Sequence, residues 1–166
     1  MISFSTTKRT LLLAFALLMS SPTIAQSDVW HDLLSALKFA DVNRARLEFD
    51  CNQNPLYRTK DMLVALCKKR YEVPNHVYEE AALPYLKKHL TESMAKQALA
   101  QVSGNTWQSL SRKLRTEIRT GKHDQLTQED IDLLEKQNQS EVGKALSIFA
   151  SDKEQGIAVA RAILTY

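Results

Sequence analysis

The sequence predicts an all-α fold, a compact bundle of about six to eight short helices with one disulfide. The helix-favouring residues Leu, Ala, Lys, Gln and Glu are frequent, whereas Gly occurs only four times in 166 residues. No stretch of about four to eight residues alternates apolar and polar side chains as a half-buried strand does. Apolar residues instead recur at spacings of three and four, between residues that commonly cap helices.

Residues 1–25 predict an export signal. Lys8 and Arg9 form a short positive start, and Leu11–Met19 is an unbroken apolar core. This order is typical of secretory signal peptides. The core is too short for a membrane-spanning helix, which needs about 20 apolar residues. We therefore expect no transmembrane anchor in this segment.

The expected cleavage site lies between Ala25 and Gln26, because Thr23 and Ala25 place small residues at the positions that signal peptidases require. Residues 26–166 contain no repeat, low-complexity tract or linker, and they predict a single helical domain. This domain is expected in the periplasm or outside the cell.

The first half of the domain predicts three helices. A second helix, from about Thr59 to Tyr71, follows a loop expected at Asp50–Pro55, and a third begins after Pro74. Pro84 should kink or divide this third helix. The first helix is capped by Asp28, and its apolar side chains share one face: Trp30, Leu33, Leu34 and Leu37.

The second half predicts five further helices from their capping residues. Gly104 and Gly121 are suitable ends for two of them. The last helix, Ile157–Leu164, follows two residues with capping-box spacing. The expected starts are Thr91 or Ser93, Asn105, Thr127, Ser140 and the Ser151–Glu154 pair.

Cys51 and Cys67 are the two cysteines of the chain. In an oxidising compartment the simplest interpretation is one disulfide, which would close a loop of about 15 residues. A metal pair and a reactive thiol are the alternatives. The chain has no CxxC motif and no histidine at ligand spacing from these cysteines, so the disulfide is favoured.

The sequence contains no motif that indicates catalysis. None of the four histidines lies in an HExxH motif, and no glycine-rich phosphate loop or nucleophile elbow is present. His76 and Glu80 share a helix face, where an exposed pair on the helix surface is the simpler interpretation than a metal site. We expect no catalytic residue, no metal, no cofactor and no enzymatic activity.

Charge argues against nucleic acid as a partner. Two of the 22 basic residues, Lys8 and Arg9, precede the cleavage site, so 20 remain against 19 acidic residues. A domain with a net charge near +1 lacks the strong basic excess that is typical of nucleic-acid binders. Together with the expected export, the disulfide and the lack of a chemical site, this favours a protein of the cell envelope as the partner.

The helix expected after Asn105 carries the strongest charge asymmetry. At 100° per residue its bases lie beside an apolar stripe of Trp107, Leu110, Leu114 and Ile118. They would contact an acidic protein or, weakly, an anionic lipid surface. Alternatively, acids of the next helix neutralise them: Glu129, Asp130, Asp132 and Glu135. The candidate partner-binding residues are Arg112, Arg115, Arg119 and Lys122.

The segment from Leu126 to Ile163 carries two short motifs. The first is formed by Leu126, Thr127, Glu129, Asp130 and Ile131, and the second by Ser140, Val142, Gly143 and Leu146. Through these motifs the segment resembles the end of a bacterial secreted family, the domain-of-unknown-function 2059 family. The usual proline of its second motif is replaced here by Glu141. The resemblance implies a small exported helical bundle and no active site, with Gly143 allowing close backbone packing.

These observations predict an exported, non-enzymatic helical protein that acts by binding another protein. A more specific alternative is an immunity protein or an inhibitor of a secreted toxin or envelope hydrolase. An envelope enzyme with an unrecognised site is the third hypothesis.

Overall fold

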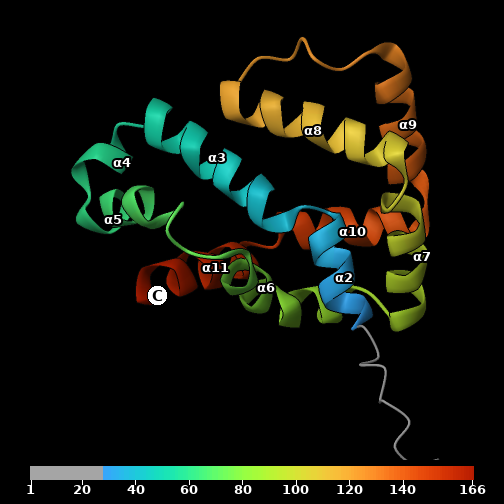
Figure 1. Ribbon diagram of the computed structural model, residues 1–166, viewed down its shortest axis with the longest axis horizontal. Helices are drawn as coiled ribbons and strands as arrows, with labels where there is room; N and C mark the ends of the chain where they lie inside the picture. The colour runs from blue at the N-terminus through green and yellow to red at the C-terminus, as the bar shows by residue number, and fades with distance from the viewer. Residues whose placement is uncertain (1–27) are drawn as a thin grey trace, which may run out of the picture.

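The computed structural model describes residues 28–166, which form ten helices and no strand (Figure 1). The all-α prediction is confirmed, but the predicted count of six to eight helices is wrong. The export signal and the cleavage site at Ala25 and Gln26 lie outside the described residues. The helices are α2 (Val29–Ala36), α3 (Phe39–Gln53), α4 (Leu56–Thr59), α5 (Asp61–Lys69), α6 (Asn75–His89), α7 (Glu92–Val102), α8 (Asn105–Thr120), α9 (Gln128–Gln139), α10 (Glu141–Ser151) and α11 (Lys153–Thr165).

The two helices that were not expected are α3 and α4. α3 has almost no apolar stripe, because its buried residues are confined to its first half, at Phe39, Ala40 and Ala45. Its polar side chains contact neighbouring segments instead. The helix continues to Gln53, so much of the loop expected at Asp50–Pro55 is helical.

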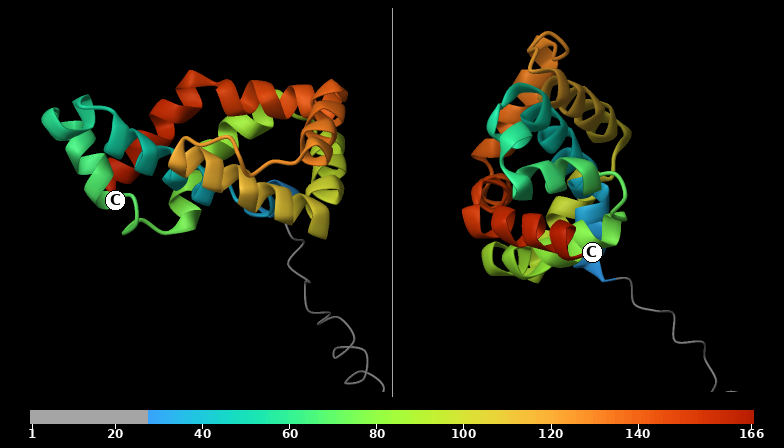
Figure 2. Two further views of the ribbon diagram at one scale, coloured as in Figure 1. Left: turned by 90° about the horizontal axis from the view of Figure 1, so that it is seen from above. Right: turned by 90° about the vertical axis from the view of Figure 1, so that its left-hand side faces the viewer.

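The core forms around α6. Tyr78, Ala82 and Leu86 of this helix are completely buried. α2, α3, α10 and α11 all contact α6 (Figures 1 and 2). α6 continues through Pro84 and is not divided there. Proline has no N–H group, so one backbone carbonyl of the preceding turn lacks its helical hydrogen bond. Because Pro84 is exposed, water can hydrate this carbonyl.

α8 packs along α3, on the side of α3 away from α11 (Figure 1). Leu110, near its start, is completely buried, whereas Leu114 and Ile118 are half-buried. The apolar stripe of α8 is therefore covered fully at Leu110 and partly at its other positions, Trp107 included. Gly121 ends the helix in the left-handed conformation at φ 67°, with Phe49 against it.

The disulfide between Cys51 and Cys67 is confirmed. Cys51 lies in the last turn of α3 rather than in a loop, and its Cα atom is 6.0 Å from that of Cys67 in α5. Leu66 is the one buried residue of α4 and α5. The disulfide therefore holds α4 and α5, which bury little apolar surface, to the end of α3.

Arg44 fixes the segment between α5 and α6. Its guanidinium group donates hydrogen bonds to the backbone carbonyls of Arg70, at 3.1 Å, and Val73, at 2.8 Å. It also lies 4.8 Å from the centre of the Tyr78 ring, whose hydroxyl donates to the same Arg70 carbonyl. This segment is consequently held to α3 along its length.

The last three helices begin at well-formed caps. Thr127 and Asp130 form a capping box at the start of α9, as expected, and Ser140 caps α10. The last helix is capped by Asp152 rather than by Ser151, and it begins at Lys153. Within residues 28–166, no helix has the length and apolar character needed to cross a bilayer.

Candidate functional site

α8 separates its charges onto two flanks of the helix. Lys113 and Glu117 face the 121–127 loop and the start of α9, whereas Arg112, Arg115 and Arg119 lie on the other flank, where Arg119 faces Glu48 of α3. The apolar stripe runs between the two flanks. The two groups of charges therefore have different neighbours.

The flank that faces α9 is neutralised internally. Lys113 Nζ lies 2.5 Å from the carboxylate of Asp130, and this contact is the main reason that the pKa of Asp130 falls to about 2. Glu117 is buried and accepts hydrogen bonds from the backbone N–H groups of Gln125, at 2.9 Å, and Leu126, at 3.2 Å. These contacts hold the loop that connects α8 to α9.

The other flank carries Arg112, Arg115 and Arg119, whereas Lys122 lies beyond Gly121, outside the helix. We call these four predicted residues the open basic face. Three of them are exposed, while Arg115 is half-buried and donates to the hydroxyl of Ser111 at 2.8 Å. Arg119 Nε lies 3.0 Å from Oε2 of Glu48 on α3. Among the described residues this is the one ion pair made by the open basic face.

The acids of α9 do not neutralise this face. Of the four acids considered from the sequence, Asp130 pairs with Lys113 on the opposite flank. Among residues 28–166, no ion pair joins Glu129, Asp132 or Glu135 to the open basic face. Internal neutralisation therefore applies to the α9-facing flank, and the open basic face keeps most of its charge.

Tyr71 extends the open basic face beyond α8. Its hydroxyl donates a hydrogen bond of 2.6 Å to Oε2 of Glu48, the same oxygen that faces Arg119. The guanidinium carbon of Arg70 lies 4.5 Å from the centre of the Tyr71 ring. Tyr71 is nevertheless 57% exposed.

Sequence reasoning missed Glu48, Tyr71 and Arg70 as parts of this surface. They come from α3 and from the segment after α5, far from α8 in the chain. No helical periodicity connects residues of three separate segments. Their proximity follows from the packing of α3 against α8, which the sequence pattern does not specify.

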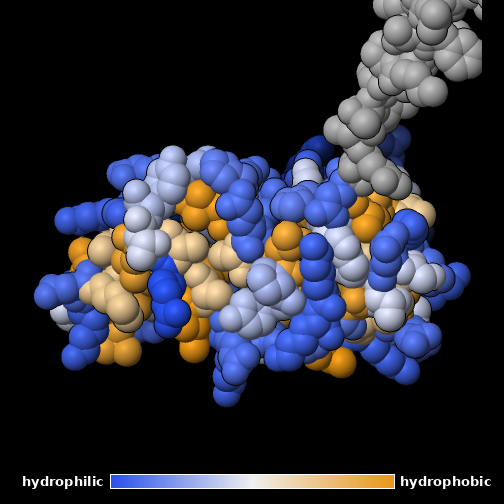
Figure 3. Space-filling view, turned by 90° about the horizontal axis from the view of Figure 1, so that it is seen from below, coloured by the Kyte–Doolittle hydropathy of each residue, from blue (hydrophilic) through white to orange (hydrophobic). Residues whose placement is uncertain are grey.

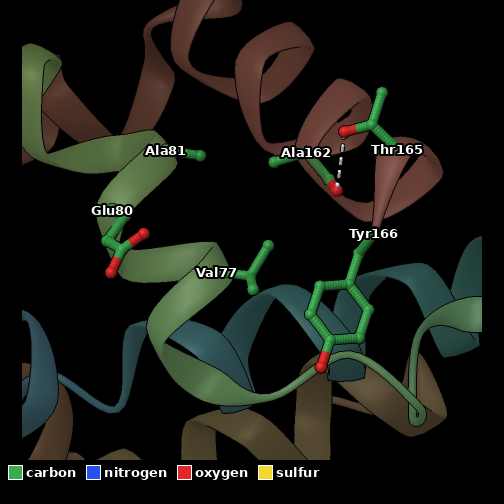
Figure 4. A pocket seen from close by; sticks show the side chains of 6 residues that line it. All are labelled: Val77, Glu80, Ala81, Ala162, Thr165 and Tyr166. Atoms are coloured by element: carbon green, nitrogen blue, oxygen red, sulfur yellow. Dashed lines mark hydrogen bonds between the residues drawn. The ribbon is translucent and has the colours of Figure 1, made fainter.

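A hollow of about 480 Å³ lies between α6 and the end of α11 (Figure 4). Val77, Ala81 and Ala162 form its apolar wall, and Tyr166 and Glu80 lie at its edges. Figure 3 shows apolar side chains gathered on this side of the molecule, over α11 and the adjoining part of α6. Glu80 is the one charged side chain among the residues that line the hollow.

A second polar cluster joins the end of α6 to the start of α11. The imidazole Nε2 of His89 lies 2.8 Å from the carboxylate of Asp152, and Lys88 Nζ lies 3.5 Å from it. The hydrogen bond from His89 is the main reason that the pKa of Asp152 falls to about 2. Because Asp152 also caps α11, this cluster has a structural role.

The histidines do not form a metal centre in the described part of the chain. His76 and Glu80, which share a face of α6, are both exposed. Among residues 28–166, no group of three or more histidine, cysteine or acidic side chains is arranged to hold a metal ion.

The chain matches no protein-family model, and no curated protein or solved structure shows significant similarity to it.

Proposed function

We propose that this protein is exported and acts without catalysis, by binding another protein in the cell envelope. The sequence of residues 1–25 supports export. The Cys51–Cys67 disulfide is consistent with an oxidising compartment, where such crosslinks persist.

The open basic face is the observation that carries the proposal. Three bases occupy one flank of α8 and Lys122 follows just beyond its end, and among the described residues Glu48 alone pairs with any of the four. A concentration of one charge attracts a partner of the opposite charge and orients it during encounter. The flank that faces α9 shows that this chain can neutralise its bases, so the open side is suited to an external contact.

We extend the proposal to the resemblance with the domain-of-unknown-function 2059 family. Several residues that carry the resemblance have structural roles. Thr127 and Asp130 cap α9, while Ser140 and Gly143 form the tight turn into α10. The shared pattern thus supports a common helical scaffold.

Photo-crosslinking in the native envelope tests the proposal. A photoreactive amino acid in place of Thr116, which lies between Arg112 and Arg119 on α8, should yield a discrete adduct with another protein. The same probe in place of Arg161, exposed on α11, is the matched control and should not yield it. Absence of an adduct from position 116, or equal adducts from both positions, would contradict the proposal.

The adduct would also decide between classes of partner. A secreted toxin or an envelope hydrolase in the adduct would support an immunity or inhibitor role. Any other protein would leave general protein binding as the function.

A further inference from the structure

We infer that Tyr71 and Arg119, joined through Glu48, form one preorganised docking site for an acidic segment of the partner protein. This inference rests on the proposed function and deepens it, because it specifies the residues and the chemistry of the contact.

Arg119 is oriented for a second carboxylate. Its Nε atom faces Glu48 at 3.0 Å, and its side chain is 52% exposed. Among the described residues, the two terminal nitrogens of this guanidinium group donate no hydrogen bond. Such a pair of parallel N–H donors matches the two oxygens of a carboxylate. Glu48 therefore holds Arg119 in place without occupying the edge that a partner would use.

Tyr71 is both exposed and fixed. Its hydroxyl is bonded to Glu48 and one face of its ring lies against the guanidinium group of Arg70. A side chain that is already held loses less conformational freedom when a partner covers it. Tyrosine and arginine are also enriched among the residues that dominate binding energy at protein interfaces.

The backbone that carries this site is anchored on both sides. Arg44 binds the carbonyls of Arg70 and Val73, next to Tyr71, and the Cys51–Cys67 disulfide lies one turn beyond Glu48. α3 is thus held to the segment that carries Tyr71 on one side and packs against α8 on the other. The relative positions of Tyr71 and Arg119 are set by the fold and need not form on binding.

The site fits an acidic protein segment better than an anionic lipid surface. A carboxylate, Glu48, lies in its centre and would be repelled by a continuous negative surface. The apolar stripe of α8 is turned toward α3, with Leu110 completely buried, so it cannot insert into a bilayer. A peptide can instead place one carboxylate on Arg119 and an apolar side chain on Tyr71.

Fluorescence polarisation with the labelled peptide Glu-Leu-Glu-Glu-Leu-Glu tests this inference on the oxidised protein. Arg119→Gln and Tyr71→Ala should each weaken binding by about tenfold or more. Tyr71→Phe, which keeps the ring but removes its anchor, should weaken binding by a smaller factor. Arg161→Gln and Tyr166→Ala, at exposed positions near the end of α11, are the matched controls and should bind like the native protein.

Circular dichroism of each variant ensures that the comparison is made between folded proteins. Native-like binding by folded Arg119→Gln and Tyr71→Ala variants would overturn the inference. So would binding to phosphatidylglycerol vesicles without binding to the peptide, which would assign the surface to lipid. If the peptide test fails while the adduct from position 116 persists, the inference alone is wrong, whereas loss of both contradicts the proposed function.

Discussion

Arg119 on α8 lies 3.0 Å from the carboxylate of Glu48 on α3. This ion pair fastens the open basic face to the body of the molecule near one end and leaves Arg112 and Lys122 without an acidic neighbour among the described ion pairs. The face is therefore positioned by the fold without being neutralised by it. This relationship underlies the binding function that we propose.

Removing the disulfide should destabilise the protein. Cys51 and Cys67 are 16 residues apart, and closing a loop of this length contributes roughly 3 kcal/mol in the chain-entropy model. The double variant Cys51→Ser/Cys67→Ser should therefore unfold at a lower temperature, measured by circular dichroism. Hydrogen exchange should rise most in α4 and α5, whose one buried residue is Leu66. Unchanged melting would show that packing alone holds these helices.

Two glycines should respond in opposite directions to substitution by alanine. A Cβ atom at Gly143 would overlap the backbone carbonyl of Gln137, so Gly143→Ala should cost roughly 1–3 kcal/mol. Gly156, within α11, has nothing within 4 Å of an added Cβ, and Gly156→Ala should stabilise by about 0.5–1 kcal/mol. Denaturant unfolding measures both changes. An unchanged unfolding free energy in the Gly143→Ala variant would refute the close approach of α9 and α10.

Stability should fall in acid as Asp152 becomes protonated. The pKa of this carboxyl is lowered to about 2, chiefly by the hydrogen bond from His89. A carboxyl with a lowered pKa stabilises the folded state above its ordinary pKa of about 3.9, and this stabilisation is lost as pH falls toward about 2. The unfolding free energy should therefore decline over this interval.

Asp152→Asn should reduce the loss of unfolding free energy in acid. Because the pKa of Asp130 is also lowered to about 2, the single variant should keep part of the pH dependence, and Asp130→Asn/Asp152→Asn should lose more of it. Urea unfolding at a series of pH values is the appropriate measurement. If the unfolding free energy of the double variant depended on pH as that of the native protein does, Asp130 and Asp152 would not be the cause of the loss of stability in acid.

The sequence predicts much of the fold, because most helices have strong local signals. The Thr127 cap, the Gly121 end and the disulfide are all observed. α3 was missed because its polar residues, among them Arg44 and Glu48, contact other segments and leave little apolar periodicity. Such tertiary contacts have no local signature in the chain.

The candidate site was predictable only in part. Helical periodicity places Arg112, Arg115, Arg119 and Lys122 on one arc, but it cannot identify which acids lie opposite them. The structure pairs Asp130 with Lys113 and brings Glu48 to Arg119 from a distant helix. These pairings depend on how α8 is rotated against α3 and α9.

Charge reversal on the open basic face tests the central claim, that this face binds a partner protein. The variant Arg112→Glu/Arg115→Glu/Arg119→Glu should remain folded. Arg112 and Arg119 are exposed, and an exposed ion pair such as the one between Arg119 and Glu48 typically contributes about 0.2–1 kcal/mol. The half-buried Arg115 loses one hydrogen bond, to Ser111, which contributes about 1 kcal/mol. It should lose the adduct that forms from a photoreactive residue at position 116. Any binding of the partner protein that remains in this variant should depend less on salt concentration than binding to the native protein does.

The matched control reverses three exposed bases of α10 and α11, in the variant Lys144→Glu/Lys153→Glu/Arg161→Glu. The most direct measurement is the adduct yield from position 116 in both folded variants, relative to the native protein. We predict a native yield in the control and loss of the adduct in the α8 variant. Equal yields in the two variants would contradict binding through the open basic face.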